Sequence, residues 1–303
     1  MISRAPILPK KITRSLRGRL LHNESLARYT SWRVGGPADY LFVPTDNEDL
    51  AVFFSILPAD VPLLWMGLGS NLLVRDGGFR GAVICTHKGL AHAFVCGDTG
   101  YFAQAGVTCA KVARASVRAG RLGAEFMAGI PGTVGGALAM NAGAYGKETW
   151  DIVDKVELID RQGQIHQCTK HAFDIGYRSV GGYNCRWFLS ATLELVAGRK
   201  DEGRRTIRSL LNTRGNEQPI NDRSAGSVFK NPCGDFAARL IDVAGLKGRR
   251  CGGAQVSSRH ANFIINTGQA TALDIEFLIS QIKDAVARSS GIELVEEVRI
   301  VGE

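Results

Sequence analysis

The stretch EFMAGIPGTVGGALAMNAGAYG, residues 125–146, contains six glycines, five alanines and a single charged residue, Glu125. Four of the glycines are spaced too irregularly to form one packing face of a helix: Gly129, Gly132, Gly135 and Gly136. Pro131 fixes the backbone before a segment that we expect to begin a short helix near Thr133. Two interpretations remain open. The small residues either let this helix pack closely on a sheet, or they leave backbone N–H groups accessible to an anion such as a pyrophosphate.

A second glycine-rich loop, GLGSNLLVRDGGFRG, follows the apolar stretch VPLLWMG (61–67), which predicts a buried strand. Gly67 and Gly69 match the first two glycines of the Rossmann G-x-G-x-x-G pattern, but Leu72 occupies the third position. The following residues are strand-like, with a tight turn at 76–78, so a Rossmann site is excluded here. The loop is either a plain turn or a phosphate loop that uses backbone N–H groups and the Ser70 hydroxyl. Two such loops in one chain favour a dinucleotide.

Strands and helices alternate along the chain without an internal repeat. YLFVP (40–44) predicts a strand, and Thr45 with Glu48 predicts a capping box that starts the next helix. We expect a helix over 108–120, capped by Thr108 and ended by Gly120. The regular apolar face of 271–291, which stops at Gly291, indicates a helix that packs on the core and takes no part in chemistry.

Composition indicates an ordinary globular protein of 303 residues, 45% hydrophobic and 22% charged, with two or three folding units. We find no apolar run of about 20 residues and no signal-peptide pattern, so we expect a cytoplasmic protein without membrane insertion. Six of the eight excess positive charges lie in residues 1–20, which favours a solvated leader over a segment that contacts RNA, anionic lipid or a partner: Arg4, Lys10, Lys11, Arg14, Arg17 and Arg19. The seven cysteines are scattered and form no C-x-x-C pair, which favours reduced thiols and no metal site.

Eight segments resemble, in order from about residue 22 to the C-terminus, signature segments of the UDP-N-acetylenolpyruvoylglucosamine reductase (MurB) family of bacterial peptidoglycan synthesis. They are YTSWRVGGPADYLFVP, GLGSNLLVRDGGFRG, GAEFMAGIPGTVGGALAMNAGAYG, GYRSVGG, SAGSVFKNP, AARLIDVAGLKG, GGAQVSSRHANFIIN and EEVRIVG. The distance from GYRS to SAGS leaves no room for an element that one branch of the family carries. The chain therefore resembles the shorter branch, and the substrate-binding tyrosine of that element is not expected.

The resemblance implies an α+β protein: an FAD-binding fold of the vanillyl-alcohol oxidase type, made of two α/β subdomains, and a smaller C-terminal α+β substrate domain. We expect the FAD region at 1–202, with subdomains at about 1–80 and 81–202, and the substrate domain at 203–303, whose last strand can pack back on the FAD region. FAD is expected to bind without a covalent bond, with NADPH as co-substrate. The residues expected to line it are Gly67, Gly69, Ser70, Asn71, Leu72, Gly129, Pro131, Gly132, Thr133, Gly135, Gly136, Asn141 and Ala142.

Three residues match the catalytic positions of the family. Arg178, in GYRS, is expected to polarise the substrate carboxylate, although a surface arginine at a helix end is the plain alternative. Ser227, in SAGS, matches the proton donor, and the same letters are also typical of a turn. Glu297 matches a glutamate of the last strand that acts with the arginine on the developing enolate. Its neighbour Glu296 is expected to point to the opposite face.

Four further residues are expected to contact the UDP-sugar or the reacting groups. Lys230 and Asn231 are candidates to stabilise the alkoxide that Ser227 would leave. Arg299, two residues beyond Glu297, could hold that glutamate or a substrate phosphate, or form an ordinary ion pair at a strand edge. His260 is expected on a strand near the UDP-sugar, although a lone histidine is more often structural.

Two other functions remain open. A carbohydrate oxidase of the same fold could tether its flavin through His87, His92 or Cys96, and a silent nucleotide-sugar binding protein would need only the two phosphate loops. The expected partners are a UDP-sugar and NADPH, with no nucleic acid. The sequence predicts no oligomeric state.

Overall fold

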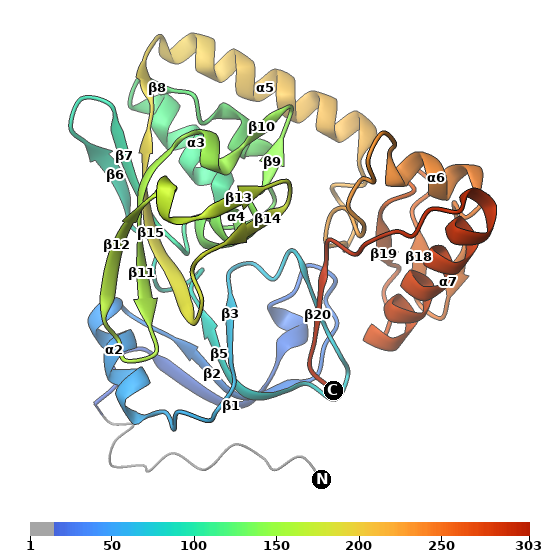
Figure 1. Ribbon diagram of the computed structural model, residues 1–303, viewed down its shortest axis with the longest axis horizontal. Helices are drawn as coiled ribbons and strands as arrows, with labels where there is room; N and C mark the ends of the chain where they lie inside the picture. The colour runs from blue at the N-terminus through green and yellow to red at the C-terminus, as the bar shows by residue number, and fades with distance from the viewer. Residues whose placement is uncertain (1–14) are drawn as a thin grey trace. The chain divides into compact units, whose positions relative to one another are not determined.

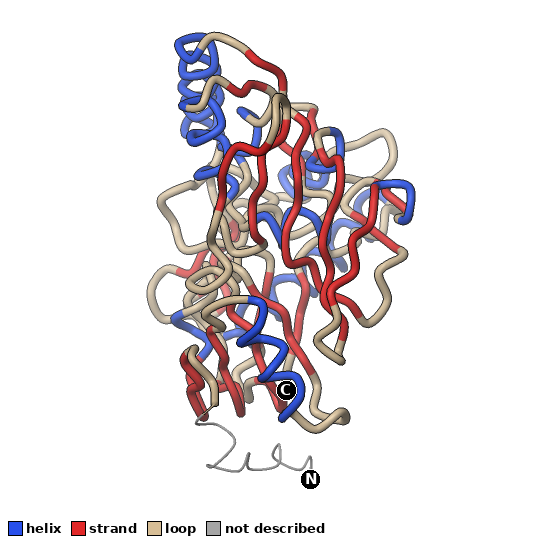
Figure 2. Tube along the Cα trace, turned by 90° about the vertical axis from the view of Figure 1, so that its left-hand side faces the viewer, coloured by secondary structure: helices blue, strands red, loops and turns tan. Residues whose placement is uncertain are grey.

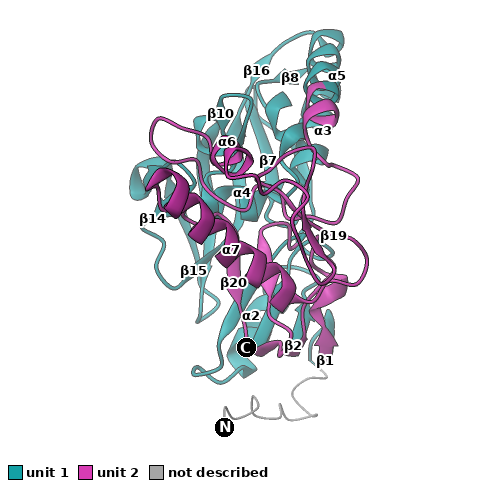
Figure 3. Cartoon of the chain, turned by 90° about the vertical axis from the view of Figure 1, so that its right-hand side faces the viewer, with its two compact units in different colours: residues 1–22, 39–68, 81–212 teal, residues 23–38, 69–80, 213–303 magenta. Residues whose placement is uncertain are grey.

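A computed structural model describes residues 15–303, so Arg4, Lys10, Lys11 and Arg14 of the expected leader lie outside the described residues. The chain divides into two compact units, shown in two colours in Figure 3. Unit 1 contains residues 1–22, 39–68 and 81–212, and unit 2 contains residues 23–38, 69–80 and 213–303. These units differ in their bounds from the expected domains at 1–202 and 203–303, and that division stays a prediction.

The first sheet of unit 1 has the strand order β1-β2-β5-β3. Its strands are β1 (Arg19–Ser25), β2 (Pro37–Val43), β3 (Leu63–Met66) and β5 (Phe79–Cys85), and β3 pairs with β5 in parallel. The predicted helix is α2 (Asn47–Ile56), which packs its phenylalanines against β2. The capping box expected at Thr45 is wrong, because Asp46 caps the helix by accepting a hydrogen bond from the Asp49 N–H at 2.9 Å.

The second sheet of unit 1 is antiparallel, with the order β12-β11-β15-β7-β6, and its strands run side by side in Figure 2. They are β6 (Ala93–Cys96), β7 (Gly100–Gln104), β11 (Val153–Asp160), β12 (Ile165–Thr169) and β15 (Arg186–Glu194). Two helices pack on it, α3 (Cys109–Arg118) and α4 (Val134–Met140). The short helix expected near Thr133 is therefore α4, and Thr108 caps α3 as predicted.

Smaller elements of unit 1 carry part of the site. The hairpin of β9 (Gly143–Ala144) and β10 (Lys147–Glu148) and the hairpin of β13 (Asp174–Gly176) and β14 (Ser179–Gly181) are two-stranded sheets (Figure 1). The remaining elements are the pair β8 (Arg121–Leu122) with β16 (Val196–Ala197), and the long helix α5 (Lys200–Glu217).

Unit 2 contains the three-stranded sheet β17-β18-β19 and two helices on one hydrophobic core. The elements are β17 (Arg250–Cys251), β18 (Ala254–Val256), β19 (Ile264–Asn266), α6 (Ala237–Val243) and α7 (Ala272–Ser290). The core helix expected at 271–291 is α7, with Thr271 as its N-cap and Gly291 at its C-terminus. The last strand, β20 (Arg299–Val301), pairs in parallel with β4 (Leu72–Val74), which follows the first glycine loop.

Candidate active site

The two glycine-rich loops meet in unit 1 at the side chain of Thr133. A Cβ atom built on Gly67 would lie 2.2 Å from Thr133 Oγ1, so only glycine allows this approach. Gly136 lies on the other side of the same hydroxyl, and a Cβ atom built there would lie 3.9 Å from it. The structure therefore places Gly67, from the first loop, beside residues 133–136 of the second loop.

Close packing, the first of the two interpretations considered above, explains part of the glycine content of residues 125–146. A Cβ atom on Gly129 would lie 2.5 Å from the Tyr145 ring, and one on Gly135 would lie 2.8 Å from the Ala105 Cβ, so these two glycines permit close packing. Gly136, in contrast, is exposed. The expectation of unhindered amides is wrong in part. The N–H groups of Gly132, Val134 and Gly135 donate to the carbonyls of Ile130, Val107 and Ala105.

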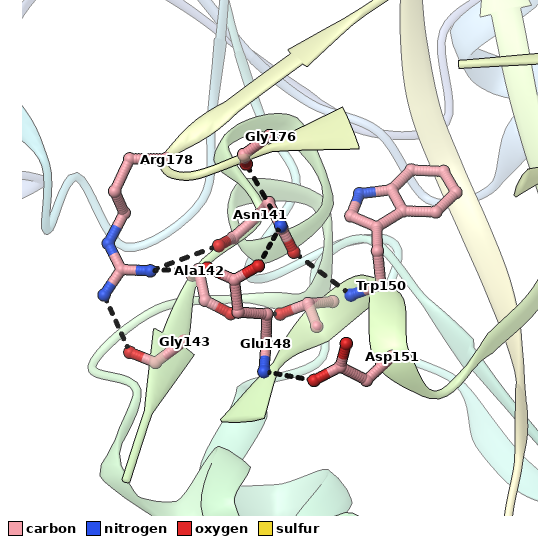
Figure 4. Close-up of polar contacts among 9 residues, drawn as sticks. Asn141, Ala142, Gly143, Glu148, Trp150, Asp151, Gly176 and Arg178 are labelled. Atoms are coloured by element: carbon pink, nitrogen blue, oxygen red, sulfur yellow. Dashed lines mark hydrogen bonds and ion pairs between the residues drawn. The ribbon is translucent and has the colours of Figure 1, made fainter. Parts of the chain in front are cut away.

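Arg178 lies in the tight turn between β13 and β14, with a φ of +51°. A left-handed backbone is costly for a residue other than glycine, by about 1 kcal/mol or more, and is often retained at functional sites. Its guanidinium turns back onto the chain after α4, where Nη1 donates to the Asn141 carbonyl at 3.3 Å and Nη2 to the Gly143 carbonyl at 3.1 Å (Figure 4). The alternative of a surface arginine at a helix end is therefore wrong.

Asn141, expected near FAD, joins three segments of the chain. Its φ is +46° and its side chain is buried. The amide nitrogen donates to Glu148 Oε2 at 2.7 Å and to the Gly176 carbonyl at 3.1 Å, and the amide oxygen accepts from the Trp150 N–H at 3.2 Å (Figure 4). Both hydrogens of the side-chain amide therefore bond within the protein, and the expected contact of Asn141 with FAD stays a prediction.

Ser227 and Glu297 are carried by neighbouring segments of unit 2. The Glu297 N–H donates to the Val228 carbonyl at 2.8 Å, so the residue after Ser227 pairs directly with the chain at Glu297. Asn71, of the first glycine loop, donates from its side chain to the Glu297 carbonyl at 3.0 Å and accepts the Arg299 N–H at its own carbonyl. The structure thus brings together residues 71, 227 and 297, which the sequence placed in three separate motifs.

The segment that carries Ser227 is fixed by Asn262, which sequence analysis missed although it lies within the quoted motif SSRHANF. The buried Asn262 amide accepts from the Phe229 N–H at 2.9 Å and donates to the Phe229 carbonyl at 2.8 Å. Its own carbonyl accepts from the Val228 N–H at 2.9 Å. The sequence signal that could have identified Asn262 is its position within that motif.

Glu296 and Glu297 precede β20, so the expected position of Glu297 in the last strand is wrong, and the expected opposite faces of the two side chains stay a prediction. Glu296 forms an ion pair with Lys283 of α7 at 2.7 Å, so its negative charge is paired within unit 2. Glu297 is half-buried beside the segment of Ser227, and Arg299, which opens β20, is exposed. This arrangement supports Glu297, and not Glu296, as the candidate for chemistry.

The remaining candidates lie in loops of unit 2. Lys230 pairs through its backbone N–H with the Val295 carbonyl, and the Asn231 side-chain oxygen accepts the N–H of Ala237 at the start of α6. His260 lies in the loop between β18 and β19, so the expected strand position is wrong. Burial lowers the pKa of His260, and its Nδ1 atom is buried without a partner in the described structure. A neutral imidazole is therefore the dominant form at pH 7.

Comparisons with known proteins match two parts of the chain to two family models. Residues 38–169 match the family model "FAD binding domain", and residues 218–301 match "UDP-N-acetylenolpyruvoylglucosamine reductase, C-terminal domain". The UDP-N-acetylenolpyruvoylglucosamine reductase of Alkalilimnicola ehrlichii is 55% identical over 94% of this chain and 96% of that protein. The chain belongs to the UDP-N-acetylenolpyruvoylglucosamine reductase family.

Two further relatives agree with this membership. The UDP-N-acetylenolpyruvoylglucosamine reductase of Methylococcus capsulatus is 52% identical, covering 95% of this chain and 94% of that protein. The crystal structure of UDP-N-acetylenolpyruvylglucosamine reductase (MurB) from Thermus caldophilus aligns with a TM-score of 0.81 and 32% identity, covering 95% of this chain and 100% of that one. The predicted α+β FAD-binding fold of the vanillyl-alcohol oxidase type with a C-terminal domain is confirmed, and the protein is an FAD-dependent oxidoreductase.

The residues around Thr133 fit an FAD site of a reductase of this family. Thr133 is 1% exposed and occupies the N-cap position of α4, yet its hydroxyl makes no capping bond and has no partner among the described residues. A buried hydroxyl without a partner is costly and needs an explanation, such as a ligand. The Thr133 hydroxyl and the backbone of Gly67 and Gly136, which carries no side chains, together form a polar surface that fits a group of FAD. Within residues 15–303, no group of His, Cys, Asp or Glu side chains could hold a metal ion, and no helix combines the length and apolarity needed to cross a membrane.

We predict that Thr133→Val changes stability and FAD affinity in opposite directions. Removing an unsatisfied buried hydroxyl is expected to stabilise the apoprotein by about 1 kcal/mol, and removing a donor to FAD to weaken FAD binding by about tenfold. Thermal denaturation of the apoprotein and fluorescence titration with FAD measure the two effects. Thr30→Val is the control, because the Thr30 hydroxyl donates to the Val34 carbonyl at 2.8 Å and its loss destabilises. Unchanged FAD affinity in Thr133→Val would remove Thr133 from the cofactor site.

Proposed function

We propose that this protein uses NADPH, through FAD bound without a covalent bond, to reduce the enolpyruvyl ether of UDP-N-acetylglucosamine-enolpyruvate to UDP-N-acetylmuramate. The reaction belongs to peptidoglycan precursor synthesis in the cytoplasm. The names of its relatives support this substrate. The observation that carries the proposal is Arg178, an arginine held in a costly backbone conformation with its side chain fixed by carbonyl oxygens. Such a guanidinium is suited to pair with a carboxylate.

The reduction adds a hydride to the terminal carbon of the double bond and a proton to the adjacent carbon. FAD, when bound and reduced, supplies the hydride. Negative charge then develops on the adjacent carbon and its carboxylate, and Arg178 stabilises it through the positive charge of its guanidinium, whose position the Asn141 and Gly143 carbonyls fix. Glu297 acts with Arg178 on this enolate.

Ser227 donates the proton that completes the reduction. A hydroxyl is a weak acid in water and serves only where the segment that carries it is fixed, as the hydrogen bonds of Val228 and Phe229 fix it. The stabilisation of the oxygen left on Ser227 is assigned to Lys230, three residues further along the chain, and that oxygen regains a proton from solvent. His260, Arg299 and Asn231 are assigned to the UDP-sugar, with the neutral imidazole acting as a hydrogen-bonding group.

The deciding experiment follows the visible spectrum of the purified holoenzyme without oxygen. NADPH is expected to bleach the flavin bands, and the UDP-linked enolpyruvyl sugar is expected to restore them. Acid precipitation is expected to release FAD into the supernatant, whereas a yellow pellet would indicate a covalent flavin. Bands that NADPH bleaches but the sugar does not restore would contradict the proposed substrate.

A further inference from the structure

The side chain of Arg178 is held by residues that no family motif assigns to it. We propose that Glu148 is a positioning residue that fixes the Arg178 guanidinium before the substrate carboxylate binds. Gly143 contributes by leaving space for the guanidinium, which bonds to its carbonyl. This inference rests on the proposed function, because it concerns how Arg178 reaches a substrate carboxylate. All the residues involved lie in unit 1, and Figure 4 shows their polar contacts.

The turn that carries Arg178 belongs to a two-stranded sheet, so support from outside that sheet decides its position. The Asn141 amide supplies this support by donating to the Gly176 carbonyl, two residues before Arg178. Glu148 in turn holds that amide through its Oε2 atom at 2.7 Å. The Glu148 backbone is fixed by Asp151, whose carboxylate accepts the Glu148 N–H at 2.7 Å in a capping box. The chain of contacts therefore runs from Asp151 through Glu148 and Asn141 to the turn.

Glu148 also acts on the guanidinium directly. Its second oxygen, Oε1, lies 3.8 Å from Arg178 Nη1. This distance gives attraction without a close hydrogen bond, and together with the bond to the Gly143 carbonyl it holds the arginine in place. The Arg178 side chain is 18% exposed and that of Glu148 is 34% exposed, which limits screening by solvent. Because the arginine side chain is already ordered in the free enzyme, it loses less conformational entropy when the substrate binds.

Gly143 provides the space for this arrangement. A Cβ atom built on Gly143 would lie 3.1 Å from Arg178 Nη1, 3.1 Å from Glu148 Cγ and 2.6 Å from the Lys147 carbonyl oxygen. A larger residue would therefore have to move the Lys147 carbonyl of β10 and would also press on the guanidinium and on the glutamate side chain. The sequence pattern did not single out either Gly143 or Glu148.

Glu148→Ala is expected to slow flavin reoxidation by the enolpyruvyl sugar by about tenfold to thirtyfold, since small misplacement of a reacting group is costly. Flavin reduction by NADPH is expected to stay within about twofold of wild type, since Arg178 does not act in that step. Gly143→Ala is expected to slow reoxidation by a similar factor. Glu157→Ala is the matched control, because the Glu157 carboxylate also accepts a hydrogen bond, from the Ser190 hydroxyl at 2.6 Å, outside the site.

A double-mutant cycle separates positioning from general damage to the fold. In an Arg178→Ala background, Glu148→Ala is expected to change the reoxidation rate by less than about twofold, because the residue through which it acts is gone. The same large loss in both backgrounds would overturn the proposal, as would a wild-type rate for Glu148→Ala. If Glu148→Ala fails to fold, Glu148→Gln, which keeps an oxygen for Asn141, is measured in the same cycle.

A chemical readout tests the positioning even if the proposed reaction is wrong. Phenylglyoxal labels free guanidinium groups, and mass spectrometry of the peptide that contains Arg178 gives its labelling rate. Glu148→Ala is expected to raise this rate about fivefold, because the guanidinium is no longer held against the Asn141 and Gly143 carbonyls. An unchanged labelling rate would overturn the positioning role. Failure of the sugar to reoxidise the wild-type flavin would instead contradict the proposed function.

Discussion

Ser227→Ala is expected to reduce flavin reoxidation by the enolpyruvyl sugar by about 10³-fold and to leave flavin reduction by NADPH unchanged. The hydride transfer produces negative charge on the carbon that Ser227 is proposed to protonate. Without the hydroxyl, that carbon depends on water for its proton. Stopped-flow absorbance at the flavin band measures the two half-reactions separately on the same holoenzyme.

The nearby Ser224 provides the control for this experiment. It belongs to the same S-A-G-S sequence, which is typical of a turn, so a purely structural explanation predicts comparable losses for Ser224→Ala and Ser227→Ala. The proton-donor assignment predicts loss only at Ser227. A reoxidation rate of Ser227→Ala equal to that of wild type would show that the proton comes from another group.

Local signals predicted much of the secondary structure because they act within one turn of a helix. Thr108, Thr271 and Gly291 cap or end their helices as expected, since each bond joins residues close in the chain. The cap at Thr45 failed because Asp46, a stronger N-cap residue, stands beside it. Competition between adjacent capping residues is not resolved by a pattern alone.

The site was predicted less completely, because its geometry depends on contacts between distant residues. Arg178 has no glycine or asparagine signal for its left-handed turn, and only the folded hairpin shows that its side chain returns to Gly143. Glu148 forms an ion pair with Arg178, and Asn262 bonds to Phe229, and both partners lie far along the sequence. Resemblance to a family identified the residues proposed to touch substrate, whereas the residues that hold them required the structure.

Asn262→Ala is expected to lower the free energy of unfolding of unit 2 by about 3 kcal/mol, because it leaves the N–H and the carbonyl of Phe229 unpaired. Phe229 is 1% exposed, so water replaces these bonds poorly. Faster hydrogen exchange at residues 228–230, measured by mass spectrometry, reports the local loss, and a lower urea midpoint reports the global one. The exposed Asn212, changed to alanine, serves as the control.

Asn262→Asp tests the same two bonds through pH. A protonated carboxyl group can accept from the Phe229 N–H and donate to the Phe229 carbonyl, whereas a carboxylate would oppose that carbonyl. Folding therefore favours the protonated form and raises the pKa of the new carboxyl group above its value in the unfolded chain. The variant is expected to be most stable below the unfolded pKa of about 3.9 and to lose stability as pH rises through the folded pKa. A penalty independent of pH would show that Asn262 fills space and does not pair with Phe229, and the segment of Ser227 would then need another support.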